Sequence, residues 1–280
     1  MAFFLVGVVA IGYALSWYFG NPAIMYVAIV FALGMNFYSY WYSDKLVLRM
    51  TGAREVTRQE EPVLYNIVEN LAITTGLPMP KVYVVDDPAP NAFATGRDPE
   101  HAVVAATTGL LKILDRSELE GVMAHEMAHI GNRDMLVMTV AVVLAGFVAI
   151  VADIMARTLM FGGDNRDRSP IFLIIGIAGI ILAPIAAQLI QLAISRKREY
   201  LADATAALTT RYPEGLASAL EKITQYHQPL RKVSHATAHL FISDPYGEEG
   251  KRGLMHKLNG LFATHPPAAD RIRILRKMGG

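Results

Sequence analysis

The amino-acid sequence predicts a mainly α-helical fold with a small β-sheet (α+β), in which four transmembrane helices accompany one polar domain. The hydrophobic fraction is 53% and the charged fraction only 18%, whereas soluble domains average about 25% charged residues. The apolar residues gather into long runs, and the polar stretches between them carry short helix and strand patterns. These observations indicate burial in lipid rather than a larger core.

The first pair of spans is predicted in residues 1–43, which contain no charged side chain. A Gly-Asn-Pro turn at 20–22 divides them into apolar runs of about 2–19 and 23–42. Each run is long enough to cross about 30 Å of hydrocarbon as a helix. A cleaved signal peptide is the alternative for the first run, but the run lacks a basic start and a small-residue cleavage site. We therefore expect a transmembrane hairpin.

A second transmembrane hairpin is predicted at 135–195, with spans at about 136–160 and 171–194. Asp153 and Arg157 lie one turn apart in the first of these spans, so they can pair with each other or reach the interface. Pro184 lies in the second, and membrane helices tolerate proline.

The distribution of Lys and Arg predicts the orientation of these spans. Basic residues are more frequent in cytoplasmic loops than in outer ones. Here they follow the second and fourth spans, whereas the first outer loop has no charge. Both termini and both polar segments, 44–134 and 196–280, are therefore expected in the cytoplasm. The basic residues concerned are Lys45, Arg49, Arg54, Arg58, Arg196, Lys197 and Arg198.

The first polar segment should open with a helix and a strand. Residues 60–75 have apolar positions at helical spacing and are followed by Gly76 and Pro78, which end helices. The run 81–85 alternates as a strand does. Two further strand candidates are 91–94 and 101–107.

A second helix is expected from about residue 118. Ser117 and Glu120 have the spacing of a capping box, with Ser117 as N-cap. Beyond the fourth span the pattern is helical to about residue 226, and the polar stretch 243–252 resembles a loop.

Composition excludes several classes of function. The chain has no cysteine, so a disulfide framework, a thiolate metal site and a cysteine nucleophile are all excluded. Its net charge is +1, and it has neither a long basic run nor an RNA-binding motif, so we expect no nucleic-acid partner. Any metal must be held by His, Asp or Glu.

The strongest chemical signal is the H-E-x-x-H motif at His125, Glu126 and His129, on the helix expected from residue 118. Side chains at i and i+4 lie on one face of a helix, so the two imidazoles can share one zinc ion. Glu126 is offset around the helix, so it is better placed to act on a water molecule at the metal than to be a ligand. Chance occurrence of the motif is the alternative.

A catalytic zinc site needs a third protein ligand. Glu199 directly follows the fourth span, as His129 directly precedes the third, so two antiparallel spans would return Glu199 to the same membrane face. Asp203, one turn beyond Glu199, could hold a ligand imidazole in its tautomer. On spacing alone, a solvated helix face is an equally good interpretation of both acidic residues.

Other features leave alternatives open. His235 and His239 also lie one turn apart, but no Glu stands between them, which favours a surface or packing role. A non-catalytic zinc-binding membrane protein, namely a transporter, sensor or adaptor, could use the same ligands. A transporter predicts ionisable residues within the spans, which hold few.

The motifs together resemble the HtpX-type membrane metalloproteases, relatives of the CAAX prenyl endopeptidases within the gluzincins. The resemblance rests on H-E-x-x-H at 125–129 with E-x-x-x-D at 199–203, and on the G-N-R-D run at 131–134. It extends to N-A-F-A at 91–94, to T-H-P-P at 264–267 with D-R-I at 270–272, and to the four-span layout.

The resemblance implies a gluzincin-like domain that holds one zinc ion. Glu199 would be the third ligand, Asp203 would orient a ligand, and His265 and Arg271 would stabilise the oxyanion. A strand of Asn91, Ala92, Phe93 and Ala94 would bind the substrate by backbone pairing.

The activity implied is that of a zinc endopeptidase in the plasma membrane of a prokaryote. Its substrates would be membrane or misfolded proteins, its role would be protein quality control under stress, and self-cleavage is a further hypothesis. Glu126 would remove a proton from the attacking water and later pass it to the leaving amine.

Overall fold

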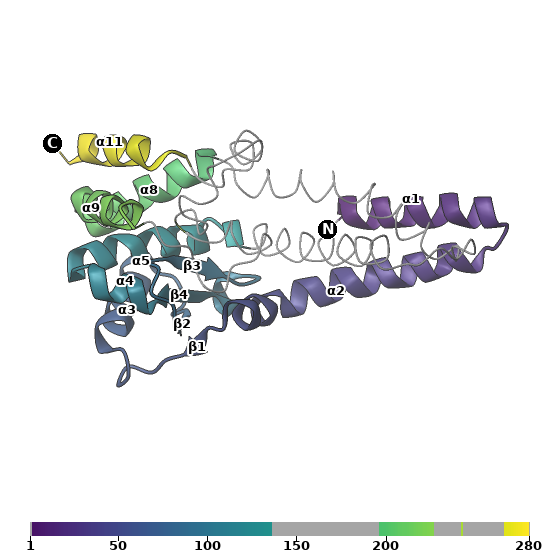
Figure 1. Ribbon diagram of the computed structural model, residues 1–280, viewed down its shortest axis with the longest axis horizontal. Coiled ribbons are helices and arrows are strands. Elements are labelled where there is room, and N and C mark those ends of the chain that lie inside the picture. Colours follow the sequence, from purple (N-terminus) through teal and green to yellow (C-terminus); the bar gives the residue numbers. More distant parts are fainter. Residues whose placement is uncertain (1, 136–195, 227–241, 243–265, 280) are drawn as a thin grey trace, which may run out of the picture. The chain divides into compact units, whose positions relative to one another are not determined.

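The computed structural model describes residues 2–135, 196–226, 242 and 266–279. The described residues belong to two compact units, one ending at Ser43 and the other beginning at Asp44. The first unit holds helix α1 (Ala2–Phe19) and most of helix α2 (Ala23–Thr51) (Figure 1). The second unit holds the polar segments, including the residues predicted to carry the chemistry.

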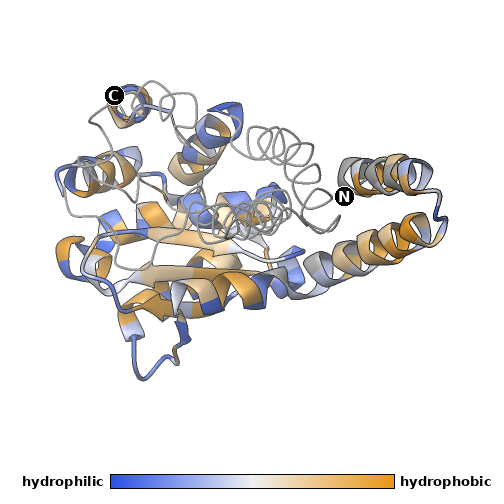
Figure 2. Cartoon of the chain, turned by 45° about the vertical axis from the view of Figure 1, so that its right-hand side comes forward, coloured by the Kyte–Doolittle hydropathy of each residue, from blue (hydrophilic) through white to orange (hydrophobic). Residues whose placement is uncertain are grey.

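Helix α1 matches the first predicted span, and helix α2 contains the second predicted span but continues beyond it to Thr51. In the described part of the chain, one stretch, Ala23–Tyr42, has the length and apolarity to cross a membrane, and Leu5–Phe19 is a shorter apolar stretch. Figure 2 shows the apolar start of α2 in orange and its polar end in paler and blue tones. The predicted spans 136–160 and 171–194 lie outside the described residues.

The second unit contains a four-stranded sheet in the order β1-β2-β4-β3 (Figure 1). The central strands β2 and β4 are parallel, while β1 pairs with β2 and β3 with β4 in antiparallel fashion. Strand β3 therefore lies at one end of the sheet. The strands are β1 (Arg54–Glu55), β2 (Lys81–Val85), β3 (Ala92–Thr95) and β4 (Val103–Thr107).

Helices and one 3-10 turn complete the second unit. They are α3 (Pro62–Thr75), η1 (Pro99–His101), α4 (Thr108–Ile113), α5 (Arg116–Gly131), α8 (Arg196–Thr210), α9 (Pro213–Thr224) and α11 (Ala268–Met278). Helix α5 contacts α3, α8, α9 and β3, and α11 packs on α9 and α8. The unit is thus organised around α5, the helix that carries the H-E-x-x-H motif.

Helix α3 and strand β2 bury the apolar residues that the sequence spaces at helical and strand intervals. Leu64, Ile67 and Leu71 are buried at helical spacing, and Gly76 ends the helix with the left-handed conformation (φ 68°) that glycine adopts without strain. In β2, Val82 and Val84 are buried on one face. These apolar faces form the core beneath α5.

The start of α5 differs from the prediction by two residues. The N-cap is Asp115, whose side chain accepts from the amide of Glu118, while the Glu118 carboxylate accepts from the amide of Asp115. The predicted capping box of Ser117 and Glu120 is therefore wrong. Two overlapping sequences fitted the motif, and Ser117 instead donates to the Asp115 carboxylate from inside the first turn.

The crossing of α5 and α9 is close because both helices carry glycine there. A Cβ on Gly121 would lie 2.6 Å from the backbone nitrogen of Leu216, and one on Gly215 would lie 2.8 Å from the carbonyl oxygen of Ser117. Buried Glu118 adds a polar link by accepting from Lys222 of α9 at 2.7 Å. Together these contacts fix α5 against α9.

Several elements depart from the predicted pattern. The helical stretch to residue 226 is divided into α8 and α9 at Arg211, whose φ is 53°. The candidate strand 101–107 begins with a 3-10 turn, so only Val103–Thr107 pairs in the sheet. Strand β1 and helix α4 were not predicted, because two and six residues give too short a pattern.

Candidate metal centre and active site

The two histidines of the motif lie side by side on the buried face of α5. His125 and His129 are 1% and 4% exposed, and their Nε2 atoms are 3.2 Å apart. Helix α5 is buried over most of its length, so this face cannot be a solvated one. Two imidazole nitrogens facing each other at this distance are suited to a shared cation.

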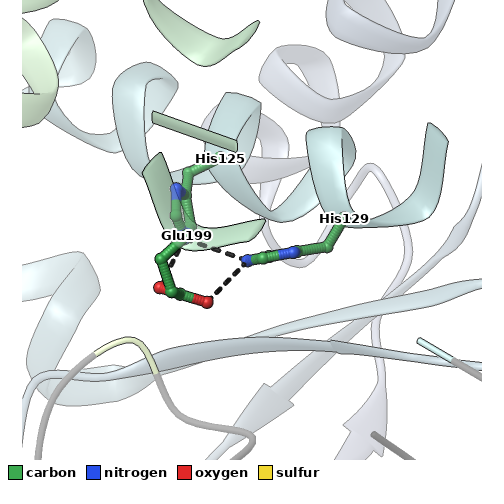
Figure 3. A group of neighbouring side chains, drawn as sticks. All are labelled: His125, His129 and Glu199. Atoms are coloured by element: carbon green, nitrogen blue, oxygen red, sulfur yellow. Dashed lines mark hydrogen bonds and ion pairs between the residues drawn. The ribbon is translucent and has the colours of Figure 1, made fainter. Parts of the chain in front are cut away.

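Glu199 on α8 completes the cluster from the other side (Figure 3). Its Oε1 lies 3.3 Å from Nε2 of His129, and its Oε2 lies 3.7 Å from Nε2 of His125. The side chain is 1% exposed. Helices α5 and α8 pack together, so the tertiary fold brings this carboxylate to the histidines.

These three donors fit the geometry of zinc. Ligand atoms about 2.0–2.1 Å from a tetrahedral zinc ion lie about 3.3 Å from one another. Here Nε2 of His129 lies 3.2 Å from Nε2 of His125 and 3.3 Å from Oε1 of Glu199, and one ligand atom from each residue lies within 4.8 Å of the other two. Two imidazoles and one carboxylate are also a donor set used by catalytic zinc sites. The cluster can therefore hold one such ion and leave a coordination position for water or substrate.

Asp203 contacts His125 and is itself held by Arg271. Its Oδ1 lies 3.0 Å from Nδ1 of His125. Arg271 of α11 donates to both carboxylate oxygens, through Nε at 2.8 Å and Nη2 at 2.7 Å. Asp203 thus lies at Nδ1 of the His125 ring, while Nε2 of the same ring lies 3.2 Å from Nε2 of His129. A ring that donates through Nδ1 presents Nε2 as its acceptor.

Arg271 is fully buried at the cluster, with 1% of its side chain exposed. Its Nη1 lies 3.7 Å from Glu199, and its Nη2 lies 3.4 Å from both ring nitrogens of His125. One turn along α11, Leu275 is buried on the same face, and helix α11 rests on α9. The packing of α11 thus delivers the guanidinium to the site.

The surroundings shift the pKa values of the two histidines in opposite directions. Burial lowers the pKa of His125 to about 4, against the opposing pull of Asp203. Burial also acts to lower the pKa of His129, but the carboxylates of Asp134 and Glu199 outweigh it and raise that pKa to about 10. A metal ion at the Nε2 atoms competes with this proton for His129.

Asp203 stays ionised in this environment. Burial acts to raise its pKa, but hydrogen bonds from His125 and Arg271 outweigh burial and lower the pKa to about 2. The Asp203 carboxylate raises the already high pKa of Arg271 despite the burial of the guanidinium. The pair is therefore a fixed charge pair beside the cluster.

Asp134 is a buried carboxylate for which the sequence predicted no role. Its Oδ2 lies 3.1 Å from Nδ1 of His129, and its Oδ1 lies 3.6 Å from Nη1 of Arg198. It is 4% exposed. The signal in the sequence was the Gly131-Asn132 pair, because such residues mark a turn that can fold the chain back onto the helix.

Glu126 lies between the two histidines on α5 and is 3% exposed. Its charge acts on both His129 and Arg271. The motif residues that the sequence placed together are therefore together in the fold. His265, and the alternative pair of His235 and His239, lie outside the described residues.

The residues predicted to bind substrate form or flank strand β3 at the end of the sheet. Asn91 precedes the strand, and its carbonyl accepts from Thr107 of β4. Ala92 points its carbonyl the other way, where it accepts from the amide of Ile242 at 3.1 Å. All four residues of β3 are buried. The outward edge of β3 is thus covered in part by this same chain.

A family model, peptidase family M48, matches residues 58–279, a range that contains every donor and orienting residue described above. The chain belongs to peptidase family M48. This family of metalloproteases is zinc-dependent, in agreement with the cluster of His125, His129 and Glu199 as a group able to bind a metal.

Two relatives of this M48 chain are both named protease HtpX homolog. A protease HtpX homolog of Tropheryma whipplei (strain Twist) is 54% identical over 252 residues, covering 90% of this chain and 84% of that protein. A protease HtpX homolog of Pyrococcus furiosus is 50% identical over 280 residues, covering 99% and 93% respectively. The predicted HtpX-type membrane zinc metalloprotease is confirmed.

The fold is shared with a solved structure. The crystal structure of S. mikatae Ste24p matches with a TM-score of 0.53 at 16% identity, covering 98% of this chain and 67% of that one. This M48 protein is a metalloendopeptidase, as the sequence predicted, and the family assignment disfavours the non-catalytic alternative.

Proposed function

We propose that this M48 chain holds one zinc ion through His125, His129 and Glu199 and hydrolyses peptide bonds in membrane or misfolded proteins, as a quality-control endopeptidase of the plasma membrane. The observation that carries the proposal is the convergence of three donor residues from α5 and α8, with one ligand atom from each within 4.8 Å of the other two. When bound, zinc would polarise the scissile carbonyl and lower the pKa of a water molecule toward about 7.

Glu126 is the proposed general base. It is buried on α5 next to His125, its charge acts on His129 and Arg271, and it does not belong to the donor set. It would accept the proton of the attacking water and then deliver it to the amine that leaves the cleaved bond. A buried carboxylate beside other charges is suited to both steps, because few waters compete for its proton.

Arg271 and Asp203 have separate proposed roles. Asp203 would hold His125 with Nε2 toward the metal. Arg271 would orient Asp203 by its two hydrogen bonds, and its positive charge would stabilise the oxyanion of the tetrahedral intermediate. His265 stays a prediction for the same oxyanion.

The substrate would pair with β3 as an added strand. Alternate residues of an antiparallel strand direct their backbone groups toward the partner strand, and the residues between them direct theirs away from it. The backbone groups of Ala92 and Ala94 therefore both point away from β4, toward the outward edge of the sheet. The amide of Ile242 already donates to Ala92. A substrate strand would have to replace this contact in order to pair along the whole edge.

The activity is tested by metal removal and restoration. The detergent-purified protein should cleave casein, lose cleavage after treatment with a chelator, and regain it with about one equivalent of zinc. Magnesium should not restore cleavage, since imidazole ligands favour zinc over magnesium. Cleavage that persists in the fully metal-free protein would contradict the proposal. The same samples without casein show self-cleavage as loss of the full-length chain.

The proposed topology is four crossings with both termini in the cytoplasm. The chain would divide into a transmembrane hairpin (1–43), the first part of the protease domain (44–134), a second hairpin (135–195) and the second part (196–280). The support is the apolar character of α1 and of Ala23–Tyr42 and the basic residues that follow the spans.

Cysteine labelling tests this topology, because the chain contains no cysteine of its own. Asn21→Cys lies in the turn between α1 and α2, and Glu100→Cys lies in η1 of the protease unit; both positions are exposed. In intact cells, a membrane-impermeant maleimide should label only Asn21→Cys. Permeabilised cells are the control, where both should react. Labelling of Glu100→Cys in intact cells would contradict the proposed topology, because it would place the protease unit outside the cytoplasm.

A further inference from the structure

The two histidines of the cluster have matching surroundings. Nδ1 of His125 lies 3.0 Å from Asp203, whose partner is Arg271. Nδ1 of His129 lies 3.1 Å from Asp134, whose nearby cation is Arg198. Each imidazole therefore has its own carboxylate, and each carboxylate has its own arginine.

We propose that Asp134 is a positioning residue for His129, held in place by Arg198. The inference rests on the proposed zinc site and adds to it the group that directs its second histidine. A carboxylate on Nδ1 fixes the tautomer that carries hydrogen there, so that Nε2 remains available as a ligand. Nε2 of His129 faces Glu199 and His125, as this tautomer requires.

The backbone conformation that brings Asp134 to His129 is specific. Asp134 lies five positions beyond His129, and in a continuous helix it would point about 140° away around the axis, at about 100° per residue. Helix α5 instead ends at Gly131, and Arg133 adopts a left-handed conformation with φ 58°. A non-glycine residue rarely adopts this conformation. The turn returns the Asp134 carboxylate to Nδ1 of His129.

Arg198 connects the pair of Asp134 and His129 to Glu199, the third proposed donor. It precedes Glu199 directly on α8, so one turn of this helix supplies both the carboxylate of the cluster and the cation near Asp134. The two arginines differ, since Arg271 is 1% exposed and donates twice at 2.7–2.8 Å, whereas Arg198 is 26% exposed and lies 3.6 Å away. Arg198 should therefore contribute less than Asp134.

The test compares zinc affinity and metal geometry in the purified full chain. Asp134→Ala should weaken zinc binding about 10–100-fold in competition with a chelator, as the loss of an orienting carboxylate does elsewhere. In the cobalt-substituted protein it should shift the visible absorption bands, which report ligand arrangement. Asp134→Asn keeps an acceptor oxygen of the same size, so it should retain more affinity than Asp134→Ala. Arg198→Gln should weaken binding by a few-fold.

Asp98→Asn is the matched control, because Asp98 also pairs with a histidine, His101, but on the exposed surface. It should leave zinc affinity and the cobalt bands unchanged. Wild-type affinity and an unshifted cobalt spectrum in Asp134→Ala would overturn the inference. Glu199→Ala in the same assay separates the two levels: if it weakens binding while Asp134→Ala does not, only the positioning role fails. If neither weakens binding, the proposed zinc site itself fails.

Discussion

Glu126→Gln is expected to reduce the rate of casein cleavage by about 10²–10⁴-fold, the range that a positioned general base contributes. This equals about 3–5 kcal/mol of transition-state stabilisation at 1.36 kcal/mol per tenfold change. The amide is the same size as the carboxylate but cannot accept the proton of water at neutral pH. Because Glu126 lies outside the donor set of His125, His129 and Glu199, the variant should keep its zinc.

The measurement pairs initial cleavage rates with metal content by elemental mass spectrometry. Glu120→Gln provides the control on the same helix, since Glu120 is only partly buried and has no place in the cluster. It should retain its cleavage rate. A Glu126→Gln protein with full zinc and undiminished turnover would show that another group takes the proton. Loss of both zinc and activity would instead make Glu126 a structural residue of the site.

Glu199→Ala is expected to lower zinc content from about one ion per chain to a small fraction after dialysis against a weak chelator. The change removes one of the three proposed protein ligands, so the loss of affinity should exceed the 10–100-fold typical of an orienting residue. It also removes the Glu199 carboxylate that lies beside the buried guanidinium of Arg271, and the loss of this negative charge lowers stability. Activity should fall with the metal.

Glu199→Gln separates the loss of the ligand from the loss of fold. The amide fills the same volume and still offers an oxygen, but it lacks the charge, so zinc content should fall less than in Glu199→Ala. Thermal unfolding of the metal-free proteins checks that both variants fold. Zinc that stays at one ion per chain in a folded Glu199→Ala protein would remove Glu199 from the donor set.

The sequence predicted the local parts of this protein better than the distant ones. The spacing of His125 and His129 predicts two side chains on one helical face, because the helical period is local. Strand 81–85 and the helix ending at Gly76 followed from alternation and from a terminal glycine. Glu199 could be related to the histidines only through an assumed pair of antiparallel spans, so spacing alone could not decide its role.

The contacts that the sequence did not predict depend on backbone detail or on packing. Asp134 meets His129 only because the backbone of Arg133 is left-handed, and an arginine residue does not predict such a turn. Arg271 reaches Asp203 because α11 packs on α9, a contact between distant segments. The N-cap is Asp115, but the overlapping Ser117–Glu120 pair, two residues later, fits the same capping-box pattern and was predicted instead.

The wide separation of the cluster residues along the chain fixes the order in which the active site can form during protein synthesis. Arg271 follows His125 by 146 residues, which at about 5–20 residues per second takes on the order of ten seconds to translate. Throughout that interval the histidine pair exists without its complete surroundings, and before residue 199 is made the proposed third donor is missing. With the proposed site, a nascent chain would be unable to attack itself or neighbouring nascent proteins until α8 had packed on α5 and α11 on α8 and α9. The long separation would then delay proteolysis until the chain is nearly complete.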